Sequence, residues 1–101
     1  MTIAGAELHP TEVRLSALGI LAYFDDDMED AGFLYYDGTA PILTLADGTT
    51  LTTEWSGGHG SQNGSCSIRF GAKDETGHRI FFDTSQIQSL TFGDLELTIH
   101  P

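Results

Sequence analysis

The chain has 101 residues, of which 15 are Asp or Glu and four are Lys or Arg, giving a formal net charge of −11 at pH 7. Nucleic acids and anionic membrane surfaces require clustered basic residues, so this composition argues against both as partners. The acidic excess predicts solubility through self-repulsion, with attraction to a basic partner or to cations as the alternative.

A chain of this length is expected to form a single domain over residues 1–101 with one hydrophobic core. It contains no run of about 18 apolar residues, so we expect no direct membrane insertion by this segment. Cys66 is the only cysteine, which excludes an intramolecular disulfide. We expect it to fill a buried, small apolar position rather than to act as a reactive thiol.

Strand signals begin close to the N-terminus. Residues 2–8 are expected to form a weakly alternating first strand, and His9-Pro10 interrupts the pattern because proline restricts its own φ and disfavours helix in the residue before it. Alternation resumes over residues 12–15. Residues 16–24 fit either a strand or a helix, but Gly19 disfavours the helix by about 1 kcal/mol. We therefore predict a strand with a β-bulge near Gly19. Its expected buried face comprises Ile20, Ala22 and Phe24.

An acidic segment and an aromatic segment come next. Residues 25–30 contain five carboxylates, whose mutual repulsion predicts a solvated loop that continues to Gly32. Residues 33–36 are predicted to form a short aromatic strand, which ends at the turn pair Asp37-Gly38.

The clearest hairpin in the chain lies around Asp47-Gly48. Residues 41–45 and 49–55 alternate on either side of this pair. Asp-Gly tolerates the positive φ angles of a type I′ turn, so we predict that turn between two antiparallel strands.

The second half of the chain continues the same pattern. A glycine-rich loop is expected over residues 56–65, then strands over 67–71 and 78–82 joined by the polar loop 73–77. Asp83 is placed to cap a turn at 84–86, after which Ile87 fills the end of the core. Gly93-Asp94 reverses the chain between the last two strands, the second of which ends at Ile99.

This succession of seven to nine short strands without a long helix predicts an all-β fold, either an antiparallel β-sandwich or a related open barrel. The expected core draws on the large apolar residues of these strands, although strand alternation means that not all of them face inward. They are Leu15, Ile42, Leu43, Leu45, Leu51, Trp55, Ile68, Phe70, Ile80, Phe82, Ile87, Leu90, Phe92, Leu95, Leu97 and Ile99.

Two groups of residues are candidate metal ligands. Asp25, Asp27 and Glu29 resemble the opening of a calcium loop, but the sixth and twelfth positions hold Asp30 and Tyr36 instead of Gly and Glu. A less regular calcium site is the alternative to a solvated loop. The histidines lack the spacing of a zinc motif; they are His9, His59, His78 and His100.

The loop 56–61 is a candidate for a catalytic or anion-binding loop. It lacks the Lys before Ser or Thr of a phosphate loop, and Ser61 is not within a Gly-x-Ser-x-Gly frame. We therefore expect no catalytic residues, no cofactor and no metal, and we expect that the protein is not an enzyme. The aromatic residues Tyr23, Tyr35, Tyr36 and Trp55 either form a platform for sugar rings or divide between the core and a sheet edge.

Three phrases of the chain resemble a small Ig-like domain at the C-terminus of predicted membrane-anchored anti-sigma-factor-like proteins of Gram-positive bacteria. Residues 8–13 are similar to its first strand junction, which has Ser-Pro-like residues. Residues 43–48 match its central hairpin, apolar-x-apolar-x-Asp-Gly. Residues 83–94 match its closing phrase, Asp-x-Ser-x-Ile-x-Ser-apolar-x-apolar-Gly-Asp. The acidic loop 25–30 and the glycine-rich loop 56–65 have no counterpart in that pattern.

This resemblance implies an Ig-like antiparallel β-sandwich and an extracytoplasmic location within a larger membrane-anchored protein. It also implies a non-catalytic sensor or protein-interaction domain whose partner is a protein at the cell envelope. The family pattern supplies no functional residues. The alternative function is that of a carbohydrate-binding or adhesion-type β-sandwich module, and any glycan or small-molecule ligand is unknown.

Overall fold

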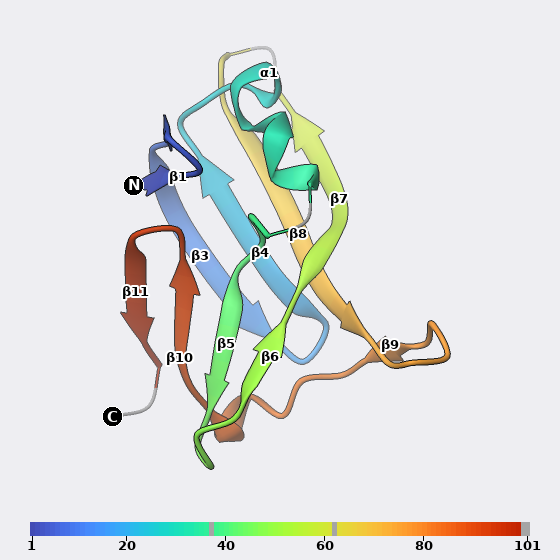
Figure 1. Ribbon diagram of the computed structural model, residues 1–101. Coiled ribbons are helices and arrows are strands. Elements are labelled where there is room, and N and C mark those ends of the chain that lie inside the picture. The colour runs from blue at the N-terminus through green and yellow to red at the C-terminus, as the bar shows by residue number, and fades with distance from the viewer. Residues whose placement is uncertain (37, 62, 100–101) are drawn as a thin grey trace.

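Two antiparallel sheets pack face to face around the core (Figure 1). The computed structural model describes residues 1–36, 38–61 and 63–99. The strands are β1 (Thr2–Ile3), β2 (Ala6–Glu7), β3 (Pro10–Ser16), β4 (Gly19–Phe24), β5 (Ile42–Leu45), β6 (Thr50–Thr52), β7 (Glu54–Gly60), β8 (Cys66–Lys73), β9 (Arg79–Ile80), β10 (Ile87–Phe92) and β11 (Leu95–Thr98). The helical segments are α1 (Met28–Ala31) and the 3₁₀ turns η1 (Gly32–Tyr35) and η2 (Thr84–Gln86).

The strand order is that of an immunoglobulin-type sandwich. One sheet has the order β3-β4-β8-β7, with β9 paired to β8, and the other has the order β11-β10-β5-β6. Successive hairpins alternate between the two sheets, which reproduces the A-B-E-D and G-F-C-C′ arrangement of immunoglobulin domains. The expected Ig-like antiparallel β-sandwich is therefore confirmed. The small hairpin β1–β2 precedes β3 and corresponds to the weak first strand of the sequence.

Alternation along the strands places the core between the sheets. Phe92 of β10 packs edge-to-face against Phe70 of β8 and Phe24 of β4, with ring centroids 5.4 and 6.0 Å apart. Ile20, Ala22 and Phe24 share the buried face of β4, as expected. The predicted core residues that are buried are Leu43, Ile68, Phe70, Phe82, Ile87, Leu90 and Phe92. Ile42 is instead 41% exposed, because it neighbours the inward-facing Leu43 on β5.

The bulge predicted near Gly19 is wrong. Residues 16–24 form a hairpin end and a strand, in which Ser16 pairs with Gly19 and Ala17-Leu18 make the turn between β3 and β4. Gly19 has a φ of +139°, and a Cβ there would lie 2.5 Å from the Phe70 carbonyl oxygen. Glycine at this position thus permits β4 to begin in direct contact with β8.

The acidic and aromatic segments are also different from the prediction. Residues 28–35 form α1 and η1 instead of a loop and a strand, and they lie at one end of the sandwich next to β7 (Figure 1). The Asp27 carboxylate caps α1 by accepting a hydrogen bond from the Asp30 N–H at 2.9 Å. Ala31 and Leu34 are fully buried, so burial of these two side chains holds the helical turns against the core. The turn predicted at Asp37-Gly38 includes Asp37, which lies outside the described residues.

The hairpin at Asp47-Gly48 is confirmed, but its turn type is not I′. Gly48 has a φ of +87°, whereas Asp47 is not among the described residues with positive φ. The Gly48 N–H donates to the Leu45 carbonyl and the Leu45 N–H to the Thr49 carbonyl, at 2.9 and 2.8 Å. This is the three-residue connection in which a type I turn is followed by a left-handed glycine. The strand predicted over residues 49–55 is divided at Thr53, because β6 and β7 belong to opposite sheets.

The expected glycine-rich loop is mostly a strand. Residues up to Gly60 belong to β7 and pair with β8, with a register shift between Trp55 and Gly57. The strand predicted over residues 78–82 is reduced to β9, and Phe81 is 66% exposed.

The closing segment agrees with the sequence interpretation. The Asp83 carboxylate accepts a hydrogen bond from the Ser85 N–H at 3.2 Å and caps η2. Ile87 is buried, and Gly93-Asp94 connects β10 to β11. A Cβ on Gly93 would lie 2.5 Å from the Thr2 carbonyl oxygen, so this turn also fits against the N-terminal hairpin.

Candidate functional site

Two carboxylates of the acidic run, those of Asp26 and Asp27, accept hydrogen bonds within the protein. Asp26 accepts a hydrogen bond from the His9 N–H at 2.6 Å, and its other oxygen lies 2.9 Å from His9 Nδ1. The hydrogen bond and the charge of Asp26 raise the pKa of His9. The charge of Asp27 is the main reason that the pKa of Asp30 is raised. Within residues 1–36, 38–61 and 63–99 there is no group of three or more His, Cys, Asp or Glu side chains that could hold a metal ion.

The histidines are dispersed over the molecule. His9 contacts Asp26, His59 lies on the outer face of β7, and His78 contacts the Thr76 hydroxyl at 2.6 Å in the loop before β9. His100 lies outside the described residues. Cys66 is buried on the inward face of β8, as expected, and burial raises the pKa of its thiol.

Three of the four aromatic residues considered for ligand contact gather at one place. Tyr35 lies between Tyr36 and Trp55, with ring centroids 6.0 and 5.9 Å away. Trp55 in turn packs against the buried Phe70 at 6.5 Å. Tyr35 and Tyr36 are 67% and 69% exposed, so the last residue of η1 and the residue that follows it present two aromatic rings to solvent. We call Tyr35, Tyr36 and Trp55 the aromatic cluster.

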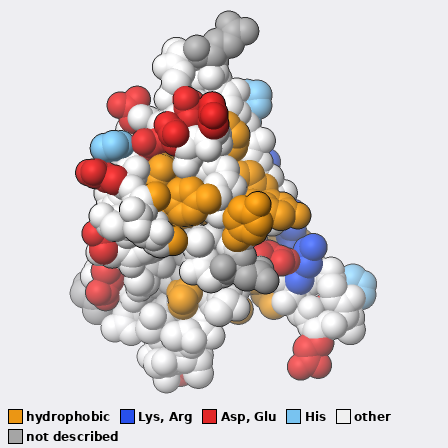
Figure 2. Space-filling view, turned by 45° about the horizontal axis from the view of Figure 1, so that its top comes forward, with side chains coloured by type: hydrophobic (Ala, Val, Ile, Leu, Met, Phe, Trp, Pro, Cys, Tyr) orange, Lys and Arg blue, Asp and Glu red, His pale blue; other side chains and the backbone are white. Residues whose placement is uncertain are grey.

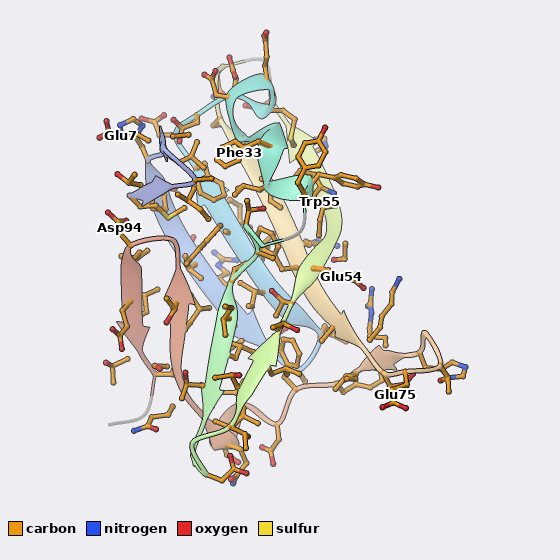
Figure 3. All side chains as sticks on the ribbon, in the orientation of Figure 1. Glu7, Phe33, Glu54, Trp55, Glu75 and Asp94 are labelled. Carbon is orange, nitrogen blue, oxygen red and sulfur yellow. The ribbon has the colours of Figure 1, made fainter. Side chains whose placement is uncertain are left out.

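The aromatic cluster lies where β7 passes the helical end of the sandwich (Figure 3). Figure 2 shows hydrophobic side chains gathered beside acidic ones at the end that carries α1. The planes of Tyr35 and Trp55 are inclined at 68°, so the two rings form a corner rather than a flat platform. Tyr23 does not belong to this cluster; it lies on the outer face of β4, with the Arg14 guanidinium 5.3 Å from its ring centre.

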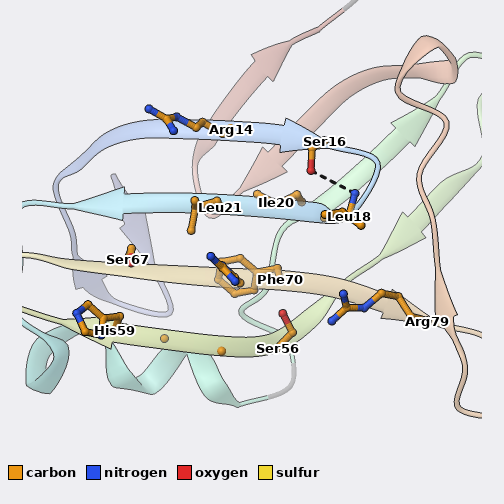
Figure 4. A pocket seen from close by; sticks show the side chains of 14 residues that line it. Arg14, Ser16, Leu18, Ile20, Leu21, Ser56, His59, Ser67, Phe70 and Arg79 are labelled. Carbon is orange, nitrogen blue, oxygen red and sulfur yellow. Dashed lines mark hydrogen bonds between the residues drawn. The ribbon is translucent and has the colours of Figure 1, made fainter.

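A second surface was not anticipated from the sequence. A groove of about 720 Å³ crosses the outer face of the β3-β4-β8-β7 sheet (Figure 4). Arg14, Arg69 and Arg79 line it, together with His59 at one end. None of the described residues that line it is Asp or Glu. We call this surface the arginine groove.

Comparisons with known proteins do not add a relative. No protein-family model matches the chain, and no curated protein or solved structure matches it either. In the part of the chain that the structure describes, no helix has the length and apolar character needed to cross a membrane. The molecule is a small Ig-like β-sandwich domain with two candidate binding surfaces, the aromatic cluster and the arginine groove.

Proposed function

We propose that this domain is a non-catalytic extracytoplasmic sensor or protein-interaction domain of a membrane-anchored anti-sigma-factor-like protein. Its protein partner at the cell envelope binds to the aromatic cluster. The resemblance of residues 8–13, 43–48 and 83–94 to such domains supports the class of protein. The aromatic cluster is the observation that carries the interaction.

Exposed aromatic rings are costly to leave in water and are enriched among the residues that dominate binding energies in protein interfaces. Tyr35 and Tyr36 are both about two-thirds exposed, yet Trp55 and Phe70 anchor the cluster to the core. A partner therefore meets rings that are already held in place, which reduces the entropy lost on binding. The carboxylates of α1 directly precede η1, so the partner surface that fits best combines apolar and basic residues.

A photo-crosslinking amino acid that replaces Tyr35 of this domain, within the full-length parent protein, tests this proposal in cells. We expect one envelope protein to be crosslinked from position 35 and the same product to be lost when Tyr36 and Trp55 are replaced by Ala. Position 81 is the matched control, because Phe81 is equally exposed at 66% but lies outside the aromatic cluster. The same product from both positions, or no product from position 35, would contradict the proposal.

Carbohydrate binding is the second candidate, and the exposed ring of Tyr35 next to Trp55 favours it. Aromatic side chains of this kind can stack on the apolar faces of sugar rings. Binding on a glycan array that disappears in the Tyr35→Ala and Trp55→Ala variants would support this function. Absence of glycan binding by the unmodified domain would exclude carbohydrate binding as its function.

A further inference from the structure

Basic residues are confined to one face of this acidic molecule. The chain has four Lys and Arg residues, and all of them belong to strands β3, β8 and β9. Arg14, Arg69 and Arg79 line the arginine groove, and Lys73 lies further along β8. Repulsion among the 15 acidic residues favours their dispersal over the surface, but it gives no reason for the few cations to converge on a groove without carboxylates.

Two of the four cations have carboxylate partners outside the groove lining. Arg14 Nε donates to Glu12 at 2.8 Å, and Lys73 lies 3.7 Å from Glu54. Neither Arg69 nor Arg79 forms an ion pair with a described residue. Their guanidinium groups are therefore available for ligands, and each presents a planar set of donors that suits a carboxylate or a phosphate.

The backbone next to Arg69 leaves room for such a ligand. Arg69 pairs with Gly57 on one side and with Leu21 on the other, and all three positions face outward. Gly57 has no side chain, and a Cβ built there would meet no atom within 4 Å. Arg69 consequently lies between an open position and an apolar side chain. The volume of about 720 Å³ is in the range of small-molecule sites.

The net charge of −11 limits the kind of anion that can approach. A long polyanion extends beyond the groove and meets the surrounding carboxylates, whereas a compact anion lies within reach of the arginines. At physiological ionic strength, charges more than about 8 Å away are largely screened, so the nearest cations determine the local attraction. A ligand with two oxyanion groups can place one group against the Arg69 guanidinium and the other against the Arg79 guanidinium.

We propose that the arginine groove binds a small anion with at least two oxyanion groups, carboxylate or phosphate, held mainly by Arg69 and Arg79. Arg14 and His59 contact the ends of this ligand. The site is separate from the aromatic cluster, so it does not depend on the protein-interaction proposal. It would give the domain a means of sensing a small anionic molecule.

Titration of the ¹⁵N-labelled chain with citrate and with pyrophosphate, at constant ionic strength set with NaCl, tests the site by NMR. We expect saturable shift changes at Leu21, Gly57 and Arg69, with dissociation constants on the order of 1 mM or lower. Tighter binding of citrate indicates a carboxylate ligand, and tighter binding of pyrophosphate indicates a phosphate ligand.

Three variants separate the groove from general charge effects. Arg69→Gln removes a cation in the groove and is expected to weaken binding by about tenfold or more. Lys73→Gln removes the same charge from the same strand outside the groove, and binding should change by no more than about twofold. Gly57→Leu fills the open position without changing a charge and should abolish binding even if Arg69→Gln folds poorly. Equal effects of Arg69→Gln and Lys73→Gln, unimpaired binding by Gly57→Leu, or no saturable shifts with either anion would overturn the proposal.

Discussion

The contact between His9 and Asp26 joins the start of β3 to the end of β4. The Asp26 hydrogen bond, and secondarily its charge, raise the pKa of His9 above its ordinary value of 6.5. A raised folded-state pKa means that protonated His9 stabilises the fold fully below the unfolded-state pKa. This contribution is lost as the pH rises through the folded-state value.

We therefore expect that the unmodified protein loses stability, relative to Asp26→Asn, as the pH is raised from roughly 5.5 to roughly 8.5. The amide oxygen introduced by Asp26→Asn can still accept the His9 N–H, but its NH2 group then faces His9 Nδ1. The variant therefore removes both the hydrogen bond and the charge that favour protonated His9. Histidine NMR titrations and unfolding midpoints across this range measure the effect. A His9 pKa at or below 6.5 in the unmodified protein would contradict the expectation.

Gly19 is the residue where backbone geometry constrains the sandwich most directly. Its φ of +139° and the distance of 2.5 Å from a built Cβ to the Phe70 oxygen both exclude a side chain. Gly19→Ala is expected to lower the free energy of unfolding by roughly 1–3 kcal/mol. Gly57→Ala serves as its control, because a Cβ there has open space, and we expect a change within about 0.5 kcal/mol. Equal urea unfolding midpoints for the two variants would contradict this expectation, because they would mean that β4 and β8 accommodate a Cβ at position 19 without loss of stability.

At the level of elements, local patterns identified the strands that alternate strongly. The hairpins around Gly48 and Gly93 and the cap at Asp83 each depend on residues close together in the chain, so the sequence was sufficient to predict them. The turns α1 and η1 contain four residues each, too few to show a helical period. Their formation depends on burial against distant strands, as does the strand conformation of the glycine-rich β7, whose partner β8 supplies the pairing.

The same distinction explains why the arginine groove was missed. Alternation in residues 12–15 and 67–70 already implies that Arg14 and Arg69 point away from the core. The two arginines line one groove because β3 and β8 lie on either side of β4 in the sheet. This strand order depends on contacts between residues distant in sequence, which local patterns do not reveal. The aromatic cluster was anticipated only as a group of residue types, because the conformation of residues 33–36 was predicted incorrectly.

The helical turn η1 provides an element-scale prediction. Leu34 is fully buried, and the Thr39 hydroxyl donates to the Tyr36 carbonyl at 2.6 Å, with the Leu34 carbonyl oxygen 3.2 Å away. Removing the Leu34 side chain leaves a cavity beneath the turn, so Leu34→Ala should cost about 2–5 kcal/mol of unfolding free energy. Tyr36→Ala, two residues away and mostly exposed, should cost less than about 1 kcal/mol. Denaturant midpoints distinguish the two, and similar losses would indicate that the turn is not anchored by Leu34.

For the whole molecule, repulsion among carboxylates is the dominant electrostatic effect. The net charge is −11, and the molecule measures 39 × 31 × 22 Å. Raising NaCl from about 0.01 M to about 0.1 M shortens the Debye length from about 30 Å to about 10 Å. Carboxylates on opposite sides of the molecule repel one another at the lower concentration and are screened at the higher one.

We therefore expect the thermal unfolding midpoint to rise over this range of NaCl. Added salt also weakens ion pairs, but Arg14–Glu12 and Lys73–Glu54 are largely exposed, and such pairs contribute about 0–1 kcal/mol. The triple variant Glu29→Gln, Glu75→Gln, Glu96→Gln carries three fewer exposed negative charges. None of these three glutamates forms an ion pair with a described residue. The variant's midpoint should be higher at low salt and should depend less on NaCl. A thermal unfolding midpoint that falls with added NaCl would mean instead that the ion pairs outweigh the repulsion among carboxylates. In that case, Arg14 and Lys73 would stabilise the fold through their pairs with Glu12 and Glu54.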